Sequence, residues 1–151
     1  MKRLLFAAAA LVVPLTASAE TKEPYTPGLG EIMTLQQMRH LKLWFAGQAQ
    51  NWPLADYELD ELKEGYEDIV KYYPTKDDAP IGVMASAVIE KEVADLNKAI
   101  DSKDRKQFTA AFDKLTASCN ACHQAAKKAF IVVQRPGANP YANQSFAPPR
   151  K

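Results

Sequence analysis

The sequence predicts an all-α fold, an antiparallel four-helix bundle. Between residues 31 and 130, apolar residues recur at steps of three and four over four stretches, which is the spacing of one face of an α-helix. Prolines and short polar segments separate these stretches, and helices joined by short connections pack antiparallel to each other. The chain has 151 residues, so we expect one domain with a core large enough to hold a bound group.

The first two predicted helices differ in how much of their surface is apolar. The first covers about residues 31–50 and is apolar over a wide arc, so we expect it to be mostly buried. Pro53 suits the first turn of the second helix, which extends to about residue 73 and has an acidic exposed side. Pro74 ends this helix, because a proline disfavours helical geometry in the residue before it.

The last two predicted helices follow a polar connection. Pro80 opens the third helix, which continues to about residue 100, and Asp101-Ser102 offers a cap for the fourth. The apolar side of the fourth helix carries residues at steps of three and four, namely Phe108, Phe112, Leu115, Cys119, Cys122 and Ala126. Both cysteines of the chain are therefore expected to face the core.

Segments of a different character flank the predicted bundle. Residues 1–19 have a charged start, a short apolar run over residues 4–15 and small residues at the end, which predicts a signal peptide cleaved after Ala19. The run is shorter than the ~20 residues that span a bilayer, so we expect no membrane span after cleavage. Residues 20–30 and 131–151 are rich in proline and glycine, and we expect extended segments, the second folding back with Tyr141 and Phe146 as anchors.

The most informative motif is Cys119-Asn120-Ala121-Cys122-His123, on the fourth predicted helix. Two thiols three positions apart with a histidine directly after them match the attachment site of a c-type haem. Each thiol adds to one vinyl group of the porphyrin, and the adjacent imidazole becomes an axial ligand of the iron. The motif predicts one covalent haem c, with Cys119 and Cys122 as thioether anchors and His123 as the proximal iron ligand.

Other interpretations of the motif have less support in the sequence. A thioredoxin-like dithiol would follow a strand, and no strand pattern precedes Cys119. A zinc site would need His40 as a fourth ligand, and a histidine directly beside Cys122 is poor spacing for it. The two cysteines could also form a disulfide in a precursor before haem loading. A helical interaction module without haem is the remaining alternative.

The sequence lacks the usual signatures of an enzyme and of a nucleic-acid-binding protein. No glycine-rich phosphate loop and no nucleophile-base pair is visible, so we expect no enzyme, although an open haem iron could react with peroxide or nitrogen oxides. The 19 basic and 18 acidic residues are interspersed, and no basic block suits a nucleic acid.

The order of helices, with the motif on the last one, resembles the class II c-type cytochromes, the cytochrome c prime family. Class I cytochromes instead have the motif near the mature amino end and a methionine ligand far downstream. The resemblance covers about residues 31–130 and implies that the first helix lies over the other face of the haem. Arg39, Leu43 and Gly47 match a family spacing, which implies that Arg39 contacts a propionate and Leu43 covers the iron. The resemblance also implies a homodimer formed through the first two helices.

The sequence does not identify the sixth ligand of the haem iron. His40 is the second histidine of the chain and could ligate the iron, or it could be a hydrogen-bonded core residue. Met33 and Met38 are the thioether candidates, and both could instead fill gaps in the core.

These residues lead to two functional expectations. The first is a periplasmic monohaem c-type cytochrome that transfers electrons between redox protein partners, and the acidic side of the second helix could bind such a partner. The second is a five-coordinate haem protein that binds a small gas ligand such as nitric oxide or carbon monoxide.

Overall fold

The computed structural model describes residues 24–150, and this part of the chain is all-helical apart from its connections and ends. The predicted signal peptide, residues 1–19, lies outside the described residues. In the described range, no helix is both long enough and apolar enough to cross a membrane. The expectation of an all-α helical bundle is confirmed.

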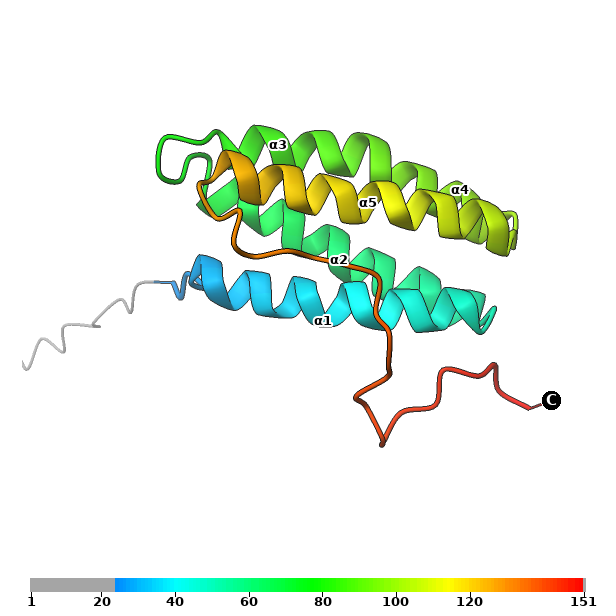
Figure 1. The fold of residues 1–151 in the computed structure, drawn as a ribbon. Coiled ribbons are helices and arrows are strands. Elements are labelled where there is room, and N and C mark those ends of the chain that lie inside the picture. Colours follow the sequence, from blue (N-terminus) through cyan, green and yellow to red (C-terminus); the bar gives the residue numbers. More distant parts are fainter. Residues whose placement is uncertain (1–23, 151) are drawn as a thin grey trace, which may run out of the picture.

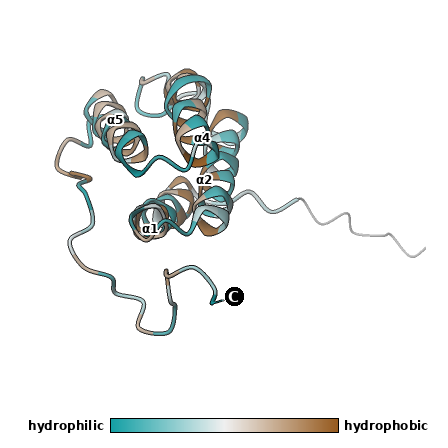
Figure 2. Ribbon diagram, turned by 90° about the vertical axis from the view of Figure 1, so that its right-hand side faces the viewer, coloured by the Kyte–Doolittle hydropathy of each residue, from teal (hydrophilic) through white to brown (hydrophobic). Residues whose placement is uncertain are grey.

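The helices form four antiparallel rods (Figure 1). Helix α1 spans Leu29–Gln48, and α2 spans Trp52–Tyr72. The third rod is continuous but mixed: α3, Ile81–Val88, passes through a π-helical turn η1, Ile89–Val93, into α4, Ala94–Asp101. Helix α5, Arg105–Ala125, completes the bundle and carries the cysteine motif. Seen along its length, the bundle arranges these rods around a shared interior (Figure 2).

One predicted helix boundary is wrong, and the hydrogen bonds explain it. The cap of α5 is Asp104, whose carboxylate accepts hydrogen bonds from the backbone N–H groups of Lys106 at 2.8 Å and Gln107 at 3.0 Å. Asp101, expected at this cap, is instead the last residue of α4. The first helix also begins slightly earlier than residue 31, because the Gly28 carbonyl accepts hydrogen bonds from the first turn.

The core is built from large apolar side chains of all four rods. Those with almost no exposed surface are Phe108, Phe112, Leu43, Leu59, Leu62, Leu96, Leu115 and Val93. The rings of Phe108 and Phe112 lie 6.0 Å apart along α5, and Trp52 and Trp44 pack against them from the side of α1 and α2. Burial of these apolar side chains is the main stabilising contribution to the fold.

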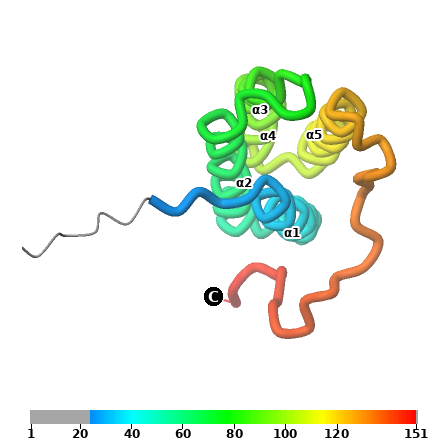
Figure 3. Tube along the Cα trace, turned by 90° about the vertical axis from the view of Figure 1, so that its left-hand side faces the viewer, coloured from blue at the N-terminus to red at the C-terminus, as the bar shows by residue number. Residues whose placement is uncertain are grey.

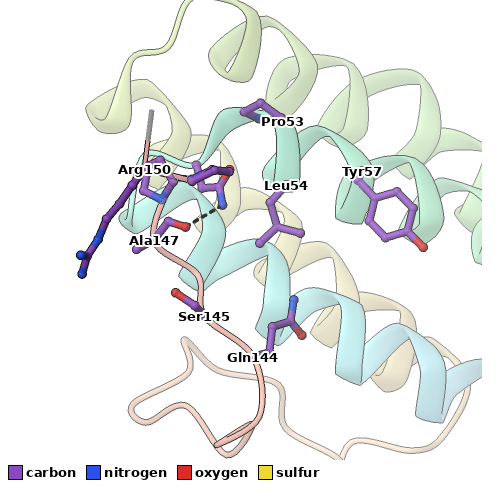
Figure 4. A pocket seen from close by; sticks show the side chains of 10 residues that line it. Pro53, Leu54, Tyr57, Gln144, Ser145, Ala147 and Arg150 are labelled. Carbon is purple, nitrogen blue, oxygen red and sulfur yellow. Dashed lines mark hydrogen bonds between the residues drawn. The ribbon is translucent and has the colours of Figure 1, made fainter.

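The segment after α5 has no regular secondary structure and runs past α5 toward the side of α1 (Figure 3). Phe146 is buried, and its ring lies 5.7 Å from that of Phe45. The Asn51 side chain donates a hydrogen bond to the Ala147 carbonyl at 3.2 Å. An open pocket lies between this segment and the start of α2 (Figure 4), and none of the predicted haem residues lines it.

Helices α1 and α5 approach closely at Gly47. A Cβ atom on Gly47 would lie 2.2 Å from two ring carbons of Phe108, well inside the contact distance. The Phe108 ring is fully buried and is held between Trp52 and Phe112, so it cannot move aside easily. Glycine at this position therefore permits the packing of α1 on α5.

We predict that Gly47→Ala lowers the free energy of unfolding by about 1–3 kcal/mol through overpacking. Gly30→Ala is the matched control, because Gly30 lies in the same helix with nothing near its Cβ position. The control should be neutral or stabilising by up to about 1 kcal/mol. Urea unfolding of both variants measures the difference, and equal stability of Gly47→Ala and the unmodified chain would contradict this account of the packing.

Candidate functional site

Helix α5 directs both cysteine side chains toward the bundle, as expected from their helical spacing. Cys119 and Cys122 are free and partly buried, and the Cys119 Sγ atom lies 3.5 Å from the Tyr66 hydroxyl oxygen of α2. Burial raises the pKa of the Cys119 thiol, and the hydrogen bond with Tyr66 acts in the opposite direction. Burial also raises the pKa of the Cys122 thiol, with a further contribution from Cys119. Both thiols are therefore protonated at neutral pH, unlike the thiolate of a reactive dithiol.

The imidazole of His123 is oriented by the chain that follows it. Its Nδ1 atom lies 2.9 Å from the Ile131 carbonyl oxygen, which can only accept a hydrogen bond. Nδ1 therefore carries the proton, and Nε2 keeps its lone pair for a metal ion. This is the usual outer hydrogen bond of a metal-binding histidine.

A sharp chain reversal makes this hydrogen bond possible. Lys127 adopts the left-handed conformation, with φ of 58°, directly after the end of α5. The N–H group of Lys128 then bonds back to the His123 carbonyl at 2.7 Å, as in a Schellman motif. The chain turns back along α5, and Ile131 returns to the side of His123.

The residues of the motif fit a covalently attached haem. Two free thiols stand at the required spacing, and the histidine beside them presents an available nitrogen. Three consecutive apolar residues next to the motif, Phe130, Ile131 and Val132, are 80%, 48% and 73% exposed. Exposed apolar patches of this kind mark a surface that binds another apolar group.

Arg39 and Leu43, the two residues to which the family resemblance gives a role at the haem, have defined positions in the bundle. Arg39 donates from one guanidinium nitrogen to the Glu61 carbonyl at 2.6 Å and from the other to the Glu61 carboxylate at 2.5 Å. Arg39 is therefore bound to α2. Leu43 is fully buried in the core.

His40 is a hydrogen-bonded core residue that links α1 to α5. Its Nε2 atom lies 2.8 Å from the Thr116 hydroxyl, which itself donates to the Phe112 carbonyl at 2.9 Å. Because that hydroxyl proton is already used, Nε2–H of His40 is the donor to Thr116. The ring also stacks on Phe112 at 4.4 Å, and burial lowers the pKa of His40 to about 4.

The register of α1 against α5 shows which of the two methionine candidates, Met33 or Met38, is level with His123. His40 pairs with Thr116, and Gln48 donates to Thr109 at 3.0 Å. The residue numbers rise along α1 as they fall along α5, so the two helices are antiparallel. Continuing this register by seven residues on each helix, about 10 Å, brings Met33 level with His123. Met33 also shares the side of α1 on which His40 lies, whereas Met38, two residues from His40, does not.

Two further residues, Tyr66 and Glu92, lie near the motif. Burial raises the pKa of Tyr66 well above its ordinary value. Glu92 is only 7% exposed, and its charge contributes to the raised pKa values of Tyr66 and Cys119. It lies in the π-helical turn η1, a feature that often marks functional regions and that has no sequence signature.

Comparisons of the chain give no match among family models, curated proteins or solved structures. Among residues 24–150, no three histidine, cysteine, aspartate or glutamate side chains are grouped so that they could hold a metal ion. The site is therefore interpreted from its own geometry.

We predict that His40 makes the stability of the fold pH-dependent. Its folded pKa of about 4 lies below the unfolded value of 6.5, so the unfolded chain binds a proton first as the pH falls. The folded state should keep its full stability above pH ~6.5 and lose about 2 kcal/mol between pH 7 and pH 5 through this residue. In His40→Phe, the free energy of unfolding measured with urea should fall less between pH 7 and pH 5. An equal fall in the variant and the unmodified chain would contradict a lowered pKa of His40.

Proposed function

We propose that the protein is a periplasmic monohaem c-type cytochrome of the class II arrangement, an electron carrier with haem attached to Cys119 and Cys122. The observation that carries the proposal is the hydrogen bond from His123 Nδ1 to the Ile131 carbonyl, which prepares Nε2 to bind iron. Bound haem would supply one reversible electron at its iron.

Each part of the site has a defined role in this proposal. The buried, protonated thiols of Cys119 and Cys122 are protected from unwanted reactions until the haem is attached. The Ile131 carbonyl raises the electron donation of His123 by accepting a hydrogen bond from its Nδ1–H group. The resemblance in helix order and motif position supports the class II arrangement.

A redox partner with a basic surface would suit α2. Its outward face presents exposed acidic residues on successive turns, Asp56, Asp60, Glu64 and Glu67. Complementary charge speeds the encounter of redox proteins without requiring a tight complex.

The second candidate function is gas binding at a five-coordinate iron. It is favoured by the state of His40, whose Nε2 atom donates to Thr116 and whose ring is held against Phe112 in the core. With His40 engaged, the choice between the two functions depends on whether Met33 binds the iron or only covers it.

Expression of the full chain in a host that exports proteins and attaches c-type haem tests the proposal. We predict a coloured protein whose mass includes one haem that survives denaturation. Cys119→Ala with Cys122→Ala should remove the haem completely, because no thioether can form. Gln124→Ala, on an exposed position of the same helix, is the control and should keep full haem content. A colourless chain, unaffected by the double substitution, would refute the cytochrome proposal and favour a helical interaction module.

Absorption spectra with and without carbon monoxide separate the two candidate functions. For the carrier with Met33 as sixth ligand, we expect a low-spin spectrum that the gas does not change, and Met33→Leu should make it high-spin and gas-sensitive. Met38→Leu is the matched control and should leave the spectrum as it was. A high-spin, gas-sensitive spectrum in the unmodified protein would instead support the gas-binding function.

A further inference from the structure

Asn120, the residue after the first cysteine of the motif, makes two hydrogen bonds to the backbone of one residue, Val133, in the chain beyond α5. Its Nδ2 atom donates to the Val133 carbonyl at 2.9 Å, and the Val133 N–H group donates to its Oδ1 atom at 2.8 Å. The side-chain amide thus pairs with the backbone as a neighbouring strand would. Haem attachment uses only the thiols and the imidazole, so it does not require this residue.

The two bonds belong to a series that holds residues 131–135, here named the strap, along α5. His123 binds the strap at Ile131, and Asn120 binds it two residues later at Val133. Farther along, Arg135 forms a bidentate ion pair with Asp113 and lies 5.1 Å above the Trp44 ring. Three positions on α5 therefore bind three alternate residues of the strap.

The strap has little support apart from these attachments. It has no helical or strand hydrogen bonding, and the apolar side chains at its beginning are exposed. On one side of Ile131 the Lys128 N–H group bonds to the His123 carbonyl, and the Ile131 N–H group donates to the Lys128 carbonyl at 2.9 Å. On the other side, the nearest fixed point is the pair of bonds to Asn120.

We propose that Asn120 is a positioning residue for His123, holding the strap so that the Ile131 carbonyl stays at the imidazole Nδ1 atom. This inference rests on the proposed function, since it concerns the ligand of the haem iron. Without Asn120, only the bond from the Ile131 N–H group to the Lys128 carbonyl holds the strap before Arg135, and Nδ1 has a less firmly fixed acceptor. The imidazole then donates less electron density, and the oxidised iron is less stabilised.

An amide is required at this position because the bonds run in opposite directions. A carboxylate can accept from the Val133 N–H group, but it places a negative oxygen against the Val133 carbonyl. Alanine can form neither bond. Asn120→Ala should therefore release the strap fully, and Asn120→Asp should release it in part.

The first measurement is amide hydrogen exchange at Val133 in the full-length mature protein, with Gln124→Ala as the control on the same helix. Loss of a hydrogen bond of ordinary strength should speed exchange about tenfold in Asn120→Ala, with an intermediate effect in Asn120→Asp and none in the control. Unchanged exchange in both Asn120 variants would overturn the proposal. Asn120→Asp also serves as the second variant if Asn120→Ala folds poorly.

The second measurement tests whether Asn120 positions His123 or only attaches the strap to α5. In the haem-loaded protein, the reduction potential should rise in Asn120→Ala, rise less in Asn120→Asp and stay constant in Gln124→Ala. Faster exchange with a constant potential would overturn the positioning role. If the chain carries no haem, the proposed function fails, and nitrogen NMR shifts of the His123 ring take the place of the potential. A dominant Nδ1–H tautomer that Asn120→Ala reduces would still support the positioning, and an unaffected tautomer would overturn it.

Discussion

The contact between Phe108 and Gly47 determines how α1 lies on α5, and the arrangement around the motif depends on it. The Phe108 ring occupies the space that a Cβ atom on Gly47 would fill, so α5 can approach α1 closely at only one position along its length. His40 and Thr116 then meet farther along the same interface, and beyond them Met33 comes level with His123. The residue opposite the motif is thus selected by packing at the far end of the bundle.

The hydrogen bond between His40 and Thr116 adds specificity to this packing. A buried imidazole without a partner costs roughly 1–3 kcal/mol, so a slip of one helical turn between α1 and α5 is penalised. The bond itself adds little net stability, because His40 gives up its hydration to form it. Apolar contacts hold the two helices together, and this polar pair reinforces the register that the contact at Gly47 sets.

The sequence pattern predicts the helices well because periodicity and proline positions are local signals. Pro53, Pro74 and Pro80 lie at the helix ends where they were expected. The start of α5 was misplaced because Asp101 and Asp104 are equally good caps by residue type, whereas in the structure α4 continues to Asp101 and the Asp104 carboxylate caps α5. The cysteines and His123 could be grouped into one motif from the sequence because their spacing is local to a single helix.

Contacts between distant segments were harder to predict. Arg39 has a side chain long enough to reach several partners, and the proximity of Glu61 on α2 decided its position. The pairing of Asn120 with Val133 joins a helix to an irregular segment, and no periodic pattern encodes such a contact. The register that favours Met33 over Met38 depends on side-chain packing that appears only when α1 and α5 are placed together.

The two sides of the candidate site therefore depend on different parts of the structure. The side of His123 is built locally, from α5, the reversal at Lys127 and the strap that returns along the same helix. The opposite side is contributed by α1 and is fixed by contacts distant in sequence. Substitutions in the interface of α1 and α5 can then change the residue of α1 that lies opposite His123 while Cys119, Cys122 and His123 stay in place. In the proposed cytochrome, this separation would allow the sixth ligand to vary while the residues for haem attachment are retained.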